Sequence, residues 1–71
     1  MRRARVQTLA TGDRFMVWGR FFEIREQTCV AFGRRWRLAV AVRADGTIGG
    51  ESVVFADEEH VAVELHAQVA A

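Results

Sequence analysis

The feature that most constrains the fold is a strict alternation of side chains between Arg35 and Arg43. Large apolar residues stand at every second position, and arginine or alanine fills the positions between them. A period of two is the pattern of a β-strand whose two faces meet different surroundings. We expect the larger residues to point into a core. The predicted inward set is Trp36, Leu38, Val40 and Val42, and the predicted outward set is Arg35, Arg37, Ala39, Ala41 and Arg43.

Shorter segments with strand character flank this central strand. Three of them precede it, at Arg14–Trp18, Phe21–Glu26 and Cys29–Phe32, and two follow it, at Ser52–Phe55 and Val61–Leu65. No segment of helical length carries a helical apolar stripe, so the chain is predicted to be all-β with five or six strands. Residues 26–28 break the pattern and form either a β-bulge or a loop. The other predicted core residues are Phe15, Val17, Phe22, Ile24, Val30, Val61, Val63 and Leu65.

The chain of 71 residues has room for one domain, which we place at residues 6–65. Val6–Leu9 predicts a short first edge strand, and residues 1–5 are expected to form a basic N-terminal arm ahead of it. Asp57–His60 begins with a capping residue followed by two acids, which predicts one short helical turn before the last strand. Residues 66–71 are expected to be a frayed tail.

Three features of this layout occur together: Gly12-Asp13 before the first long strand, the long middle strands, and the single turn at residues 57–60. In this arrangement the chain resembles the SH3-like small barrels over roughly residues 6–65. The resemblance implies a small five- to six-stranded barrel and leaves the function open, because such barrels bind peptides, nucleic acids or other subunits. The proline-motif pocket of signalling SH3 domains is built around paired tyrosines, and this chain has no Tyr.

The sequence carries no pattern of a secretory signal or of a membrane-spanning run, and the expected location of the protein depends on this. The basic start, Met1–Arg5, has no apolar region behind it, so it does not resemble a secretory signal. The longest apolar run, Leu38–Val42, is far shorter than the ~20 residues that span a bilayer. Cys29 is the only cysteine, and its apolar neighbours predict a buried thiol. We therefore expect a cytoplasmic protein with no membrane contact.

Residues able to carry chemistry are few and do not group. A nucleophile needs a base within hydrogen-bond reach, and neither Cys29 nor Ser52 has a histidine at a spacing that predicts one. His60 and His66 on one strand would be ~20 Å apart. No zinc-ligand spacing and no phosphate-binding loop is present. We expect no enzymatic activity, no cofactor, no metal and no small-molecule substrate.

Charge is distributed unevenly along the chain. Residues 1–43 hold ten Arg and three acidic residues, a formal charge of +7, whereas residues 44–71 hold six acidic residues and no Arg or Lys, a formal charge of −6. Either one face binds a polyanion, or the two halves neutralise each other as neighbouring strands. Arginines two apart on a strand lie ~6.5–7 Å apart, which suits a phosphate backbone. The candidate nucleic-acid residues are Arg20, Arg34, Arg35, Arg37, Arg43, Trp18 and Phe21.

A protein interface is the other function that the pattern predicts. The outward alanines of the central strand would leave a smooth, uncharged surface, and a free edge at Val6–Leu9 or Ser52–Phe55 would accept another strand. The candidate interface residues are Met16, Trp18, Ala39 and Ala41. We expect a small interaction module that acts through protein contact or self-association, with sequence-tolerant nucleic-acid binding as the alternative.

Overall fold

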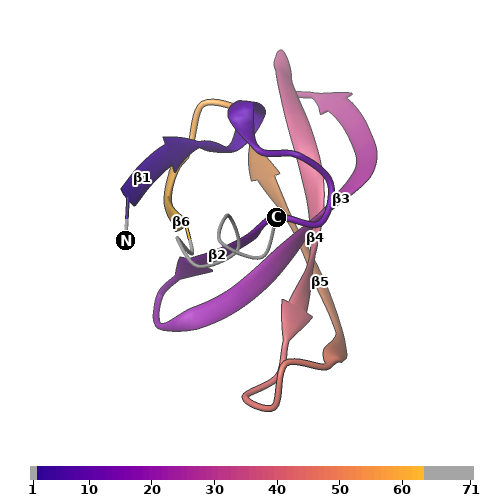
Figure 1. Cartoon of the computed structure of the whole chain (residues 1–71). Coiled ribbons are helices and arrows are strands. Elements are labelled where there is room, and N and C mark those ends of the chain that lie inside the picture. The colour runs from indigo at the N-terminus through magenta and orange to yellow at the C-terminus, as the bar shows by residue number, and fades with distance from the viewer. Residues whose placement is uncertain (1, 64–71) are drawn as a thin grey trace.

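The computed structural model describes residues 2–63, which form one antiparallel sheet of six strands (Figure 1). The order across the sheet is β1-β6-β2-β3-β4-β5, so that β1 and β5 are its edges, and within these residues the two edges do not pair to close it. The all-β prediction is confirmed, and the sheet is open. The strands are β1 (Arg2–Arg5), β2 (Arg14–Val17), β3 (Arg20–Ala31), β4 (Arg34–Val42), β5 (Ile48–Ala56) and β6 (His60–Val63).

Strands β3 and β4 form a long hairpin, whose tip lies at the top of Figure 1. β3 runs without a break through residues 26–28, and its pairing with β4 shifts between Ile24 and Thr28. Of the two alternatives for these residues, a bulge is therefore confirmed. Two extra residues on β3 bend the hairpin, because a bulge increases the local twist.

Three phenylalanine rings form the centre of the core. The ring centroid of Phe15 lies 5.9 Å from that of Phe22 and 5.2 Å from that of Phe55, and Phe22 and Phe55 are 5.4 Å apart. The first pair is stacked and the other two meet edge to face, and such contacts add about 0.5–1.5 kcal/mol each to the burial of the rings. The predicted core residues that are buried are Phe15, Phe22, Ile24, Val61 and Val63. Val17 is partly buried against this core, and Leu65 lies outside the described residues.

The predicted orientation of the central strand is wrong. Ala39 and Ala41 are buried in the core, at 0% and 7% exposure, and the four larger residues at 36, 38, 40 and 42 lie half-buried on the opposite face. In the pairing of β3 with β4, Ala39 is opposite Ile24 and Ala41 is opposite Phe22. Small residues at these positions leave space for the large ones, since a core packs best when large and small side chains alternate.

The far end of the β3–β4 hairpin projects beyond the other strands. β5 pairs with β4 only as far as Trp36, so the part of the hairpin nearer the tip has no third strand beside it within the described residues. Val30, predicted to be in the core, is 75% exposed there, and Cys29, predicted to be buried, is also exposed. Both predictions are wrong because the apolar pattern of this segment continues past the point where the core ends.

The N-terminal segment also differs from the prediction. Arg2–Arg5, predicted to be a free basic arm, is strand β1 and pairs with β6. Residues 6–8, predicted to begin an edge strand, form a 3₁₀ helix, η1 (Val6–Thr8), instead. In a 3₁₀ helix, residues three apart share a face, and this spacing buries both Val6 and Leu9. The backbone amide of Val6 donates to Glu59 O at 2.9 Å, which fixes η1 beside the end of β5.

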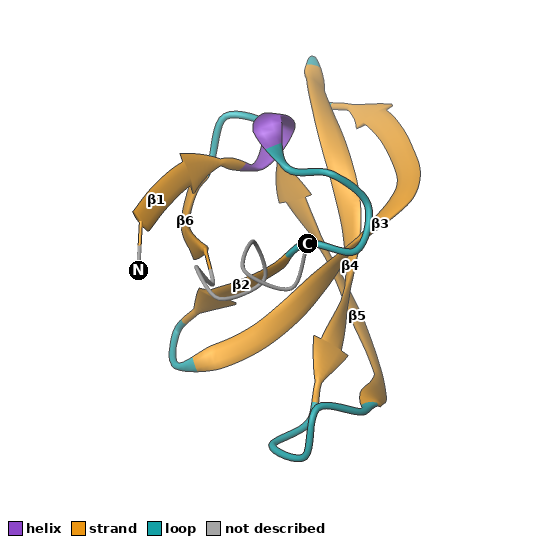
Figure 2. Cartoon of the chain, viewed as in Figure 1, coloured by secondary structure: helices purple, strands orange, loops and turns teal. Residues whose placement is uncertain are grey.

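The helical turn predicted at residues 57–60, directly before β6, is not formed. The segment predicted as a helical turn is a tight reversal in which Glu59 N donates to Ala56 O at 3.0 Å (Figure 2). Asp57 N donates to Arg35 O at 3.0 Å, so this amide bonds to a neighbouring strand and not to a helical turn. The predicted tail at residues 66–71 lies outside the described residues.

Strand β5 is longer than predicted because Gly49 and Gly50 belong to it. The register of β5 against β4 shifts between Val40 and Val42, which places a bulge at the glycines. A Cβ atom on Gly49 would lie 3.3 Å from the Ala41 carbonyl oxygen, so a side chain at this position would crowd the neighbouring strand. The predicted turn at residues 44–46 is confirmed, with Gly46 at a φ of 88° and its amide donating to Arg43 O at 2.9 Å.

Both two-residue hairpin loops place an aromatic residue in the left-handed region. Trp18 and Gly19 join β2 to β3 with φ of 54° and 74°, and Phe32 and Gly33 join β3 to β4 with φ of 55° and 72°. Positive φ at both positions is the type I′ geometry, in which Asn-Gly is preferred. A bulky residue at the first position is strained. Trp18 is 82% exposed and Phe32 is 95% exposed, so burial of these two rings offsets little of the strain.

The strain at the hairpin tip gives a stability prediction. Phe32→Asn should raise the free energy of unfolding by about 1 kcal/mol, because Asn adopts positive φ more readily and the ring is fully exposed. Trp18→Asn is the matched comparison and should gain less, since the Trp18 ring lies 6.5 Å from the Phe55 ring. Urea unfolding of the two variants measures both effects, and a loss of stability in Phe32→Asn would show that this ring contacts the fold.

Candidate functional site

One surface of the sheet carries large apolar side chains that the core does not use. We call it the outer face, and it is formed by alternate residues of β3, β4 and β5. Leu38 is opposite Val54, and Val42 is opposite both Phe21 and Ile48. Val54 is 46% exposed and Ile48 is 41% exposed, although both belong to regular strand. The outer face consists of Phe21, Trp36, Leu38, Val40, Val42, Ile48 and Val54.

One end of the outer face is a shallow apolar groove of about 150 Å³. The Trp36 ring is held there by its indole N–H, which donates to Ala31 O at 3.0 Å. Cys29 is paired with Trp36 across the strands, so the exposed thiol lies at the wall of this groove. The lining residues are Gln27, Thr28, Cys29, Trp36, Leu38 and Val54.

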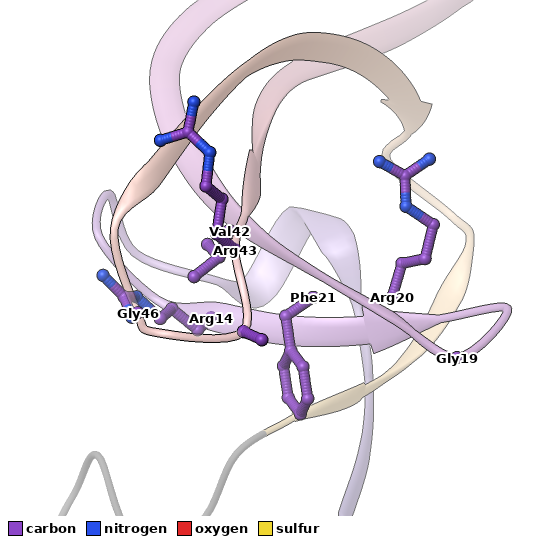
Figure 3. Close-up of a pocket in the computed structure, with 8 residues that line it drawn as sticks. Arg14, Gly19, Arg20, Phe21, Val42, Arg43 and Gly46 are labelled. Carbon is purple, nitrogen blue, oxygen red and sulfur yellow. The ribbon is translucent and has the colours of Figure 1, made fainter.

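The other end of the outer face is an open pocket of about 430 Å³ whose rim is basic (Figure 3). Figure 3 shows Phe21 between Arg14 and Gly46 on one side and Arg20 and Gly19 on the other. Several strands and turns contribute to it, since Arg14 lies on β2 and Phe21 on β3, and Gly46 belongs to the turn that follows β4. We call this the basic pocket, and its lining is Arg14, Gly19, Arg20, Phe21, Val42, Arg43, Ala44 and Gly46.

Two arginines of the basic pocket are held in place while keeping unused donors. Arg14 Nε donates to Glu23 Oε1 at 3.1 Å, and Arg25 Nη1 donates to the other oxygen of the same carboxylate at 3.3 Å. One carboxylate therefore faces two guanidinium groups, which leaves a positive charge there. Arg43 Nη1 donates to Ile48 O at 2.8 Å. Within residues 2–63, no hydrogen-bond partner faces the two terminal nitrogens of Arg14, Nη1 and Nη2, or Nη2 of Arg43.

The third arginine, Arg20, is neutralised by its own chain. Its two terminal nitrogens donate to the two carboxylate oxygens of Glu51 at 2.6 and 3.2 Å, and its guanidinium carbon lies 5.5 Å from the Phe22 ring centroid. The side-chain hydrogen bond from Arg20 lowers the pKa of the Glu51 carboxyl, with the nearby positive charge acting in the same direction. The pair joins the start of β3 to β5 across the sheet.

The Arg20–Glu51 pair predicts a dependence of stability on acid. Because the pKa of Glu51 is lowered in the folded state, its stabilising contribution is complete above the ordinary value of 4.5 and is lost as the pH falls through the lowered value. Glu51→Gln should therefore lose less stability than the parent when the pH is taken from about 7 to about 3. Thermal unfolding at both pH values measures this difference, and equal losses would contradict the pairing.

The predicted row of outward arginines does not exist as such. Arg37 points inward and is half-buried, where it donates to Arg25 O at 2.9 Å and Leu9 O at 3.2 Å. Arg35 is exposed on the projecting hairpin, and Arg34 pairs with Glu58 at 3.1 Å. This last contact joins the basic half of the chain to the acidic half, as the Arg20–Glu51 pair also does. The row separates because the orientation of β4 is opposite to the prediction.

The remaining predicted site residues lie in the basic pocket, at the β2–β3 turn or in the core. Arg20, Phe21 and Arg43 come together in the basic pocket, whereas Trp18 stands exposed at the β2–β3 turn. Of the predicted interface residues, Met16 is half-buried opposite Phe21, and Ala39 and Ala41 are in the core, where they cannot form an interface. Sequence reasoning missed Arg14, the apolar groove and the outer face of β4. Arg14 has no signal in the sequence, because its place depends on the pairing of β2 with β3.

Comparisons of the chain with protein-family models, with curated proteins and with solved structures gave no match. Within residues 2–63, no group of three or more His, Cys, Asp and Glu residues is placed to hold a metal ion. The same part of the chain contains no helix with the length and apolar character that a membrane span requires. The function is therefore argued from the outer face and the basic pocket.

Proposed function

We propose that this chain is a non-enzymatic interaction module that associates with a second copy of itself through the edge of β5. The observation that supports this is an edge strand whose outward side chains, Ile48 and Val54, are apolar and exposed. Within the described residues β5 pairs only with β4, so its other side presents free backbone groups along the edge. An exposed, apolar edge strand is a template for pairing with another strand.

The sequence of β5 suits pairing with an identical strand. Residues 52–56 contain no charge and no proline, the two devices that commonly block edge pairing. An antiparallel pair centred on Ser52 would place Val54 of each copy opposite Gly50 of the other, where no side chain obstructs it. The single charge of the strand, Glu51, is already paired with Arg20 of its own chain. The resulting twofold contact is the commonest form of homodimer.

Analytical ultracentrifugation over a concentration series tests this proposal. The parent chain should show a sedimentation coefficient that rises with concentration and depends little on salt, because the contact is apolar and made by backbone hydrogen bonds. Val54→Lys should remain monomeric, since a lysine on an edge strand disfavours pairing with another strand. Val30→Lys removes an equally apolar and more exposed valine on the projecting end of the β3–β4 hairpin, which we call the hairpin arm. This variant should associate as the parent does. A parent chain that stays monomeric would contradict the proposal.

We further propose that the sheet is an open form of the SH3-like barrel. The support is that η1, which directly follows the edge strand β1, contacts the other edge strand, β5. Nuclear Overhauser contacts between residues 4–8 and β5 test this interpretation. Strong contacts between Val6 and the end of β5 are expected, and their absence would show a sheet that does not curl back on itself.

A further inference from the structure

We propose that the basic pocket binds single-stranded nucleic acid, with phosphates on Arg14 and Arg43 and one base stacked on Phe21. This binding is a function beyond self-association, and it uses the end of the outer face that is distant from the apolar groove. It also differs from the arginine row predicted from sequence. That row consisted of Arg34, Arg35, Arg37 and Arg43 on the central strand, and of these only Arg43 lines the pocket.

The phosphate contacts follow from the way the two arginines are fixed. Arg14 Nε donates to Glu23, and Arg43 Nη1 donates to Ile48 O. Each guanidinium is therefore oriented before any ligand binds. Donors that are already oriented lose less conformational entropy when they bind an anion. Arg14 is 33% exposed at its side chain, so its charge is screened less than that of a fully solvated arginine.

The acidic residues near the pocket offset part of its charge, but their carboxylates do not reach into it. Glu23 is shared between Arg14 and Arg25, and Glu51 is occupied by Arg20. Asp45, in the turn beside Arg43, accepts hydrogen bonds from the Thr47 hydroxyl at 2.7 Å and the Thr47 amide at 3.0 Å. None of the three carboxylates lines the pocket. An anion entering it therefore meets guanidinium groups first.

The stacking contact follows from what surrounds Phe21. Three of the lining residues, Gly19, Ala44 and Gly46, have a small side chain or none, which leaves the ring accessible between the arginines (Figure 3). Phe21 is also flanked on both sides, because it lies opposite Val42 on β4 and Met16 on β2. An accessible aromatic ring beside a basic groove is the common platform for an unpaired base.

The shape of the pocket favours a strand over a small ligand. The pocket is only half enclosed, so a continuous chain can enter and leave it. The bases of a duplex are already stacked on one another and are not free to stack on the Phe21 ring. A positive rim with an accessible ring therefore matches a single strand, read through its phosphates with little sequence preference.

Fluorescence anisotropy with a labelled single-stranded oligothymidine at several salt concentrations tests this inference. The parent should bind at low salt, and the double variant Arg14→Gln with Arg43→Gln should reduce the log–log salt slope by about 1.4, which is two phosphate contacts on a single strand. Phe21→Leu should weaken binding about 5- to 150-fold without changing the slope, because it removes stacking and no charge. Thermal melting confirms that each variant is folded.

Matched variants on the hairpin arm serve as controls. Arg35→Gln and Phe32→Leu remove an exposed charge and an exposed ring away from the pocket, so both should bind as the parent does. Arg14→Lys with Arg43→Lys should restore most of the salt slope that the Gln variants lose, since the charges remain. Failure of the parent to bind at low salt would overturn the inference. Weakening by the arm variants equal to that by the pocket variants would also overturn it.

Discussion

Phe22→Ala should lower the free energy of unfolding by about 3–5 kcal/mol, the largest effect that we expect from a single truncation. Phe22 is 1% exposed, packs against both other core rings and lies beneath the Arg20 guanidinium. A domain of this size has a total stability of only about 4–10 kcal/mol. Far-UV circular dichroism during urea unfolding should therefore show a variant that is partly unfolded before denaturant is added.

The neighbouring phenylalanine is the matched control for this truncation. Phe21 lies on the other side of the same strand, half-buried on the outer face. Phe21→Ala should cost about 1 kcal/mol, because a partly exposed ring leaves no closed cavity behind. Equal losses from the two truncations would show that the core is not formed around Phe22.

Ala39→Lys should prevent folding, whereas Val40→Lys should be tolerated. Ala39 is 0% exposed and lies opposite Ile24, so a lysine there would bury an unpaired charge at a cost of about 3–5 kcal/mol and also overfill the core. Val40 lies on the outer face opposite Glu23 and Ser52, where an ammonium group meets solvent and a carboxylate. One-dimensional NMR of the two proteins measures the difference, through the presence or loss of dispersed amide signals.

A core formed by residues 36, 38, 40 and 42 predicts the opposite result. In that case Val40→Lys would unfold the chain, and Ala39→Lys would leave its spectrum unchanged. The contrast between these two adjacent positions is thus more informative than either variant alone.

The sequence predicted the class of fold well because alternation depends only on the local chain. The strand positions of β2, β3 and β4 follow from period-two patterns, and the hairpin turns follow from their glycines. The orientation of β4 could not be predicted in the same way. Alternation shows that the two faces differ, but which face is buried depends on the neighbours across the sheet. Here the large residues Phe22 and Ile24 come from β3 and lie opposite the alanines Ala41 and Ala39.

The candidate surfaces were harder to predict than the strands. Arg20, Phe21 and Arg43 were recognised as candidates, but Arg43 was grouped with Arg35 and Arg37 along the central strand. The structure brings the first three together with Arg14 through the pairing of β2 with β3 and the turn after β4. Such proximity depends on long-range register, which no single segment encodes. The large hydrophobic residues of β4 were assigned to the core for the same reason, so the outer face was missed.

The orientation of β4 is the central claim, because both the outer face and the buried alanines depend on it. Thiol labelling tests it directly, with Ala39→Cys and Val40→Cys each made in a Cys29→Ser background and labelled in dilute solution under native conditions. We expect the cysteine at position 40 to react readily and the one at position 39 to react only when the protein unfolds. Rapid labelling at position 39 together with protection at position 40 would contradict the account.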